Sequence, residues 1–110
     1  MKKTLAVTVA MLSLSMFATP GFCDTKKGEK INAQHEFEEH CAVCHPKGGN
    51  IMKPDKTLSK KSMAGHGIKS EKDIVAKMRN PGPGMNKFDA KTVSDKEAAA
   101  IAGYILKTFP

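Results

Sequence analysis

A five-residue motif, CAVCH at residues 41–45, constrains this chain more than any other feature. On a helical turn Cys41, Cys44 and His45 face one side, because residues three and four apart are neighbours. Two thiols at this separation can each add to one vinyl group of a haem and form thioethers. The imidazole that follows then lies under the iron. The motif therefore predicts one covalently attached haem c, held by Cys41 and Cys44 and with His45 as an axial iron ligand.

Other uses of two cysteines at this spacing fit the chain less well. A structural zinc site takes about four ligands, and no second cysteine pair completes one; the remaining histidines are His35, His40 and His66. A thioredoxin-like redox pair is expected beside a βαβ pattern, and no segment here alternates like a strand. A plain disulfide is the simplest alternative. The histidine directly after the second cysteine favours haem.

The N-terminal segment, residues 1–23, is predicted to be a secretory signal peptide. A positive start, MKK, precedes an apolar run over residues 4–18 that contains no charged residue. The run is too short to span a membrane comfortably, so a cleaved signal is favoured over an anchor. We expect the mature protein to be periplasmic or otherwise exported, with no transmembrane segment.

The cleavage point of this signal is approximate. Small residues at Gly21 and Cys23 suit cleavage before Asp24, and Thr19 with Gly21 gives a second candidate. Lipid attachment at Cys23, which would anchor the protein to the outer membrane, is a further alternative. The bulky Phe22 disfavours it, because a small residue usually precedes such a cysteine.

The mature domain, residues 24–110, is too small to build a large core of its own. The 110 residues less the 23 of the signal leave 87, with no Trp and one Tyr. Without Lys2 and Lys3, 16 basic residues face 11 acidic ones, a net charge of about +5. Domains of this size often need a metal, a disulfide or another insert for stability. We expect the haem to complete the core by packing against Ile51, Leu58, Ile74, Val75, Met78 and Phe88.

Apolar spacing and capping signals predict an all-α domain of about four helices. The first helix covers residues 27–44, and a short one covers residues 58–64. The third begins at Ser70, in SEKD, and stops before the prolines of NPGPG. The fourth begins at Ser94, where SDKE is a capping box. It continues as an apolar stripe of Ala98, Ile101, Ala102, Ile105 and Leu106.

The second axial ligand of the iron is sought among the methionines of the mature chain and one loop histidine. Met52 follows His45 too closely to wrap around a porphyrin, and Met63 and Met78 fall on helices, where core packing explains them. Met85 lies in a loop between prolines and Phe88, and flanking glycines allow close approach to a ring. The sequence therefore favours Met85, with His66 as the alternative that would give a bis-histidine carrier.

Four stretches of the chain, taken in order, resemble one family: FEEHCAVCH, GGNIMKPDKTL, GPGMNKF and VSDKEAAAIAGYIL. Together they are similar to the class I monohaem c-type cytochromes, of the small soluble cytochrome c-six type. The resemblance covers nearly all of the mature chain. It implies a cytochrome c-like cage in which the first and last helices cross, with Ala33 and Phe37 meeting Gly103 and Tyr104. It also points to Met85 as the second iron ligand.

These observations predict an electron-transfer protein and no enzyme. Two axial ligands leave the iron no open position for a substrate. A haem enzyme or a sensor with a labile sixth ligand is the rival from another class. We expect redox partner proteins, no nucleic acid and a monomer.

A positive surface could steer the protein toward acidic partners. The cations concerned are Lys47, Lys53, Lys56, Lys60, Lys61, Lys69, Lys72, Lys77, Lys87 and Arg79. The alternative is that these charges only keep the protein soluble.

Overall fold

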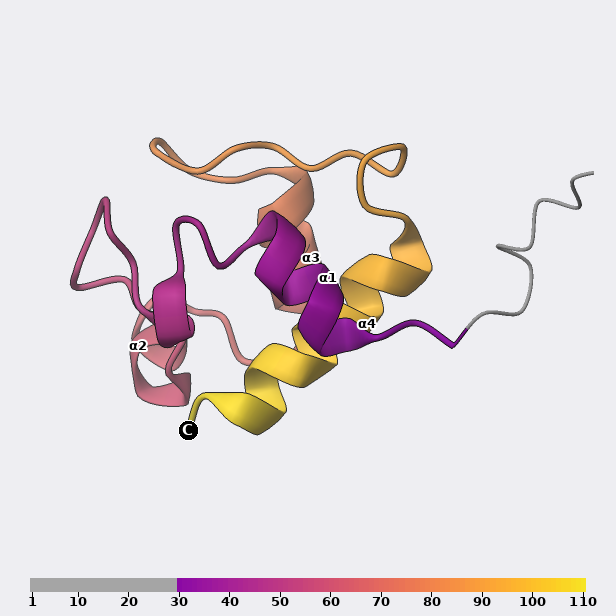
Figure 1. Cartoon of the computed structure of the whole chain (residues 1–110). Coiled ribbons are helices and arrows are strands. Elements are labelled where there is room, and N and C mark those ends of the chain that lie inside the picture. The colour runs from indigo at the N-terminus through magenta and orange to yellow at the C-terminus, as the bar shows by residue number, and fades with distance from the viewer. Residues whose placement is uncertain (1–29) are drawn as a thin grey trace, which may run out of the picture.

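The computed structural model describes residues 30–110, which form four α-helices and one 3₁₀ helix (Figure 1). In chain order they are α1 (Ala33–His40), η1 (Pro46–Gly48), α2 (Lys60–Gly65), α3 (Glu71–Arg79) and α4 (Asp95–Thr108). This part of the chain contains no strand, which confirms the predicted all-α class. The predicted signal peptide, residues 1–23, lies outside the described residues.

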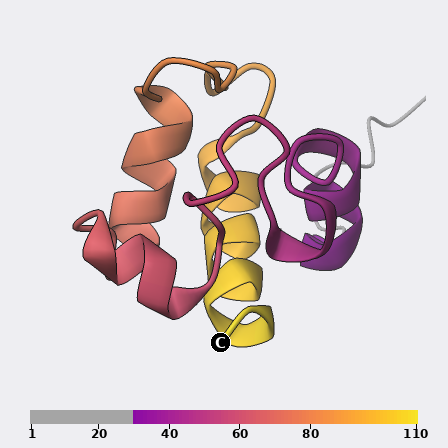
Figure 2. The same cartoon turned by 90° about the vertical axis from the view of Figure 1, so that its left-hand side faces the viewer.

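The longest helix, α4, is the centre of the fold, and both α1 and α3 pack against it (Figure 2). Its predicted apolar stripe is buried, except that Leu106 is only half-buried. Burying such a stripe is the main source of helix stability in a small domain. The buried core consists of Phe37, Met63, Ile74, Met78, Val93, Ala98, Ile101, Ala102 and Ile105.

Helices α3 and α4, which flank residues 80–93, both begin with the predicted caps. The Ser70 hydroxyl accepts from the Asp73 N–H at 3.2 Å, and the Asp73 carboxylate accepts from the Ser70 N–H at 2.9 Å. Ser94 and Glu97 form the same reciprocal pair at the start of α4. Val93, directly before that cap, is 1% exposed. This is the place of a hydrophobic staple, which fixes the direction in which the chain enters the helix.

The first helix is shorter than predicted. Residues 30–32 are not helical, since α1 begins after its cap Asn32, and the regular helix ends at His40 instead of Cys44. The next residues turn irregularly, because the Phe37 carbonyl accepts from the N–H groups of both Cys41 and Ala42. A final helical bond, from the His45 N–H to the Cys41 carbonyl at 2.8 Å, closes this turn. The CAVCH motif therefore lies on a turn that follows the helix.

Helices α1 and α4 cross, as the resemblance implies (Figure 1). The rings of Phe37 and Tyr104 lie 5.4 Å apart at their centroids, and the Phe109 ring lies 5.5 Å from Phe37. The expectation for Gly103 was wrong. A Cβ on Gly103 would meet the Glu71 carboxylate of α3 at 3.2 Å, and no atom of α1 lies within 4 Å of it.

Long loops connect these helices and surround the site. The segment between α3 and α4 runs along the top of the molecule in Figure 1, while α2 and the loop before it lie at the left. Across residues 30–110, none of the helices has the length and apolar character needed to cross a membrane.

Candidate haem site

A cavity of about 370 Å³ opens among the loops and receives side chains from each of the α-helices. Its size lies within the range of small-molecule and cofactor sites. All four predicted haem residues, Cys41, Cys44, His45 and Met85, line it. The fold therefore brings Met85 to the same cavity as the distant CAVCH motif. Apolar walls are supplied by Leu58, Met63, Ile68, Ile74, Met78, Phe88 and Ile105.

The His45 ring is oriented by a hydrogen bond from its Nδ1 to the Gly49 carbonyl, at 2.7 Å. A carbonyl can only accept, so Nδ1 carries the proton and Nε2 keeps a lone pair. The chain bends back to this position through η1, where Lys47 and Gly48 have φ values of 52° and 78°. A neutral imidazole whose other nitrogen donates to a carbonyl is the form in which histidine ligates metals.

The two cysteines are both unpaired thiols and half-buried. Burial raises the pKa of the Cys41 thiol to about 11, because a buried thiolate would lose its hydration. The position therefore suits an uncharged sulfur, such as a thioether. Within residues 30–110, the group that could hold a metal ion through three side chains is Glu36, Glu39 and His40, and it includes neither cysteine. The zinc alternative gains no support from this arrangement.

The candidates for the second axial ligand all line the cavity and differ in burial. Met63 and Met78 are each 4% exposed and belong to the core, as predicted. Met52 is 62% exposed and Met85 is 36% exposed. His66, at the end of α2, is exposed and donates from Nδ1 to the Ser62 carbonyl at 2.8 Å. Its Nε2 lone pair is thus also available.

Two of the six predicted wall residues, Ile51 and Val75, do not line the cavity, and Ile51 is 58% exposed. The sequence did not predict that His40 lines the cavity beside the motif, where its side chain is 21% exposed. Helix phase could have found it, since His40 lies three residues after the buried Phe37 on the same helix face. Asn50 and Thr57 were also missed, because they carry no sequence signal for this site.

The charge around the cavity has one sign. Lys53, Lys56 and Lys77 line it, and none of the Asp and Glu residues between positions 30 and 110 does. Haem is a flat apolar ring with two carboxylates at one edge, so apolar walls with lysines beside them suit it. Together with two half-buried thiols and an oriented imidazole, the residues present fit a haem.

An all-α domain of this size, with CAVCH in the wall of an apolar cavity, has the features of the c-type cytochromes as a class. Residues 26–105 match the family described as cytochrome c oxidase, cbb3-type, subunit III. Cytochrome c6 of a Synechococcus sp. is 31% identical over 103 residues, which cover 93% of this chain and 86% of the relative. Cytochrome c6 of a Picosynechococcus sp. is 34% identical, covering 96% and 92% respectively.

The solved structures with a similar fold are also c-type cytochromes. OmcF, an outer membrane cytochrome from Geobacter sulfurreducens, has a TM-score of 0.69 and 40% identity, covering 71% of this chain and 99% of that one. Cytochrome c6C from a Synechococcus sp. has a TM-score of 0.63 and 33% identity, covering 68% and 90%. The chain belongs to the small class I c-type cytochromes. It therefore binds one haem c covalently and transfers electrons through its iron.

Proposed function

We propose that Cys41 and Cys44 attach the haem, that His45 and Met85 ligate its iron, and that the protein carries single electrons without catalysing a reaction of its own. One observation supports this most: a single cavity gathers all four side chains from two segments far apart in the sequence. The two axial ligands would fill both faces of the iron and exclude substrates.

Haem supplies a one-electron iron couple when bound. The residues of this chain set its surroundings. The Nδ1–H bond from His45 to Gly49 fixes the ring and makes Nε2 a better donor. A methionine thioether is neutral and soft, and Met/His ligation raises the reduction potential. The apolar walls keep water away from the iron.

The open side of the cavity is the proposed docking surface for redox partners. Val43 is 75% exposed and Met52 is 62% exposed there, and Lys53 and Lys56 lie among the same loops. Apolar contacts at the centre with cations nearby suit a partner that has an acidic rim. The protein thus exchanges electrons where its apolar side chains reach solvent.

We further propose that the protein is exported and that residues 1–23 are its signal peptide. The charged start and short apolar run support this, as does the likeness to a cytochrome named for the outer membrane. Intact mass tests it. Loss of residues up to Gly21 or Cys23, plus one haem that survives denaturation, is expected; a retained leader contradicts export. An added mass of acyl chains supports lipidation of Cys23 instead.

The ligation is tested with Met85→Ala in the purified holoprotein. The oxidised wild type should have the far-red band of sulfur-to-iron charge transfer. Met85→Ala should abolish the band and lower the reduction potential, because the thioether is lost. Met52→Ala is the matched control, since Met52 lines the same cavity and is more exposed. It should leave both the band and the potential close to wild type.

A bis-histidine carrier is the second candidate, favoured by one observation. His66 lines the cavity with its Nε2 lone pair available. This candidate predicts no far-red band in the wild type and loss of the sixth ligand in His66→Ala.

Carbon monoxide tests the rival enzyme or sensor function, because rapid binding to the reduced wild type would reveal an open or labile position at the iron.

A further inference from the structure

The loop that carries Met85, residues 80–87, borders the haem cavity and packs little against the rest of the chain. Seven of its eight residues are exposed, and Pro81 is half-buried. The backbone bond within it runs from the Met85 N–H to the Gly82 carbonyl and is long, at 3.4 Å. A loop with so few contacts takes its position from its two ends. We call residues 80–87 the methionine loop.

The base of the methionine loop is closed by two hydrogen bonds to Phe88. The Phe88 N–H donates to the Met78 carbonyl at 2.9 Å, and the Phe88 carbonyl accepts from Nη1 of Arg79, also at 2.9 Å. Both backbone polar groups of Phe88 are thus held by two consecutive residues at the end of α3. The Phe88 side chain lines the cavity and packs on the core. Phe88 therefore fixes the end of the loop three residues after Met85.

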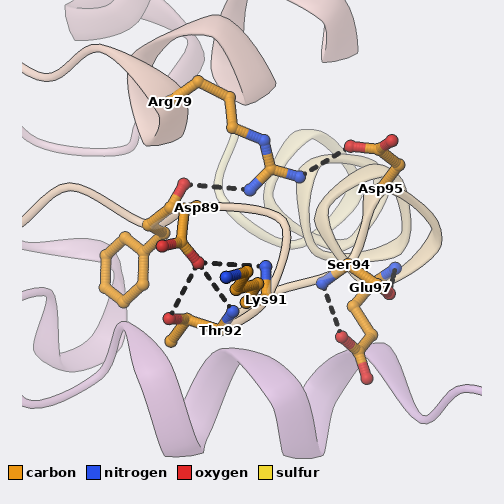
Figure 3. Close-up of polar contacts among 8 residues, drawn as sticks. Arg79, Asp89, Lys91, Thr92, Ser94, Asp95 and Glu97 are labelled. Atoms are coloured by element: carbon orange, nitrogen blue, oxygen red, sulfur yellow. Dashed lines mark hydrogen bonds and ion pairs between the residues drawn. The ribbon is translucent and has the colours of Figure 1, made fainter.

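The Arg79 guanidinium also connects the base of the methionine loop to helix α4. Its Nη2 donates to the Asp95 carboxylate at 2.8 Å, at the start of α4 (Figure 3). The Arg79 side chain is 24% exposed, whereas Asp95 is 87% exposed. The exposed ion pair contributes little stability. The part-buried, charge-assisted bond to the Phe88 carbonyl is the stronger of the two contacts.

We propose that Arg79 is the positioning residue for Met85. It holds Phe88 against the end of α3 and so limits how far the methionine loop can move from the iron. The proposal rests on the proposed function, in which Met85 is the sixth ligand. It also changes the interpretation of Arg79, which the sequence grouped with the docking cations. The guanidinium instead forms two hydrogen bonds within the fold. Its planar shape lets it donate to both acceptors at once, which a lysine cannot do.

The test is a titration of the oxidised holoprotein with imidazole, which competes with the sixth ligand. Arg79→Met keeps the apolar stem and removes both bonds. We expect its imidazole dissociation constant to fall by about tenfold, which corresponds to roughly 1.4 kcal/mol. Hydrogen exchange at the Phe88 amide should accelerate as well. Arg79→Lys can restore one bond and should give an intermediate affinity.

Two controls separate positioning from general stability. Asp95→Asn weakens the ion pair but leaves the Phe88 bond in place, so its imidazole affinity should stay within about twofold of wild type. Ala102→Gly destabilises the middle of α4, at a buried position that does not line the cavity. It should lower the unfolding midpoint without the change in imidazole affinity.

The outcomes are distinguishable. If the wild type has the far-red band and Arg79→Met binds imidazole as the wild type does, the role of Arg79 is wrong while Met85 ligation stands. An equal gain in affinity in Asp95→Asn or in Ala102→Gly overturns the role of the Phe88 bond. A wild type without the band overturns Met85 ligation, and the positioning role falls with it.

Discussion

The ring of Phe109 packs directly against Gly48, so closely that a Cβ on this glycine would lie 2.5 Å from the ring. Gly48 is buried and has a φ of 78°, a conformation that side chains rarely adopt. The same ring completes an aromatic cluster with Phe37 and Tyr104. The contact thus ties the turn after His45 to the C-terminal end of the chain.

Gly48→Ala should destabilise the protein by about 2 kcal/mol or more, because backbone strain adds to overpacking of the Phe109 ring. Denaturant unfolding of the holoprotein measures the change. Gly65→Ala is the matched control, since nothing lies within 4 Å of a Cβ at that position. It should be neutral or slightly stabilising. Equal stability of the two variants would show that the ring moves aside easily.

Removing the haem attachment should remove most of the fixed tertiary structure. The cavity is bordered by core residues such as Ile74 and Ile105, which would face water in the haem-free protein. We expect Cys41→Ala/Cys44→Ala to lose near-ultraviolet circular dichroism and cooperative unfolding. Met85→Ala serves as the control, because it keeps the covalent haem. A cooperative, fully helical double variant would contradict the view that haem completes the core.

Local signals account for what the sequence predicted well. The caps at Ser70 and Ser94 form because each involves side chains and amides only three residues apart. The stripe of α4 is periodic, so its buried face follows from the sequence alone. The loop prolines and glycines around Met85 were informative because they end one helix and leave a segment free to reach the cavity.

Tertiary contacts account for what the sequence did not predict. The end of α1 at His40 depends on the Phe37 carbonyl, which accepts two amides and disrupts the helical ladder. Gly103 was assigned to the wrong neighbour because a small residue in a helix does not reveal which partner approaches it. Glu71 of α3 takes that place.

The lysines beside the cavity should accelerate reactions with anionic redox partners. Lys53→Gln/Lys56→Gln removes two positive charges from the lining of the cavity. Stopped-flow oxidation of the reduced protein by ferricyanide, a small anion, should slow at low salt. The difference should shrink as salt is raised to about 1 M, where charges are screened beyond roughly 3 Å. Lys96→Gln/Lys107→Gln, which removes two charges from α4 outside the cavity lining, is the control and should react at nearly the wild-type rate. Equal slowing by both changes would point to net charge instead of a local surface.

Two aspartates that accept amide and hydroxyl hydrogen bonds should make the protein less stable in acid. Hydrogen bonds from the Lys69 amide and the Ser70 hydroxyl lower the pKa of Asp73 below its ordinary value of 3.8. The Thr92 amide and hydroxyl lower the pKa of Asp89 in the same way. A carboxyl with a lower pKa in the folded state stabilises the fold above the unfolded value. That stability is lost as the pH falls through the lower, folded value.

We therefore expect the unfolding midpoint to drop below pH 3.8 in the wild type, and to drop less steeply in Asp73→Asn/Asp89→Asn. At neutral pH the double variant should already be less stable, because its amides accept the same hydrogen bonds without a charge. Asp55→Asn is the control, since the Asp55 carboxylate accepts no hydrogen bond among the described contacts. Thermal unfolding at a series of pH values measures all three proteins. An unchanged acid dependence in the double variant would assign the acid sensitivity to groups other than these two carboxylates.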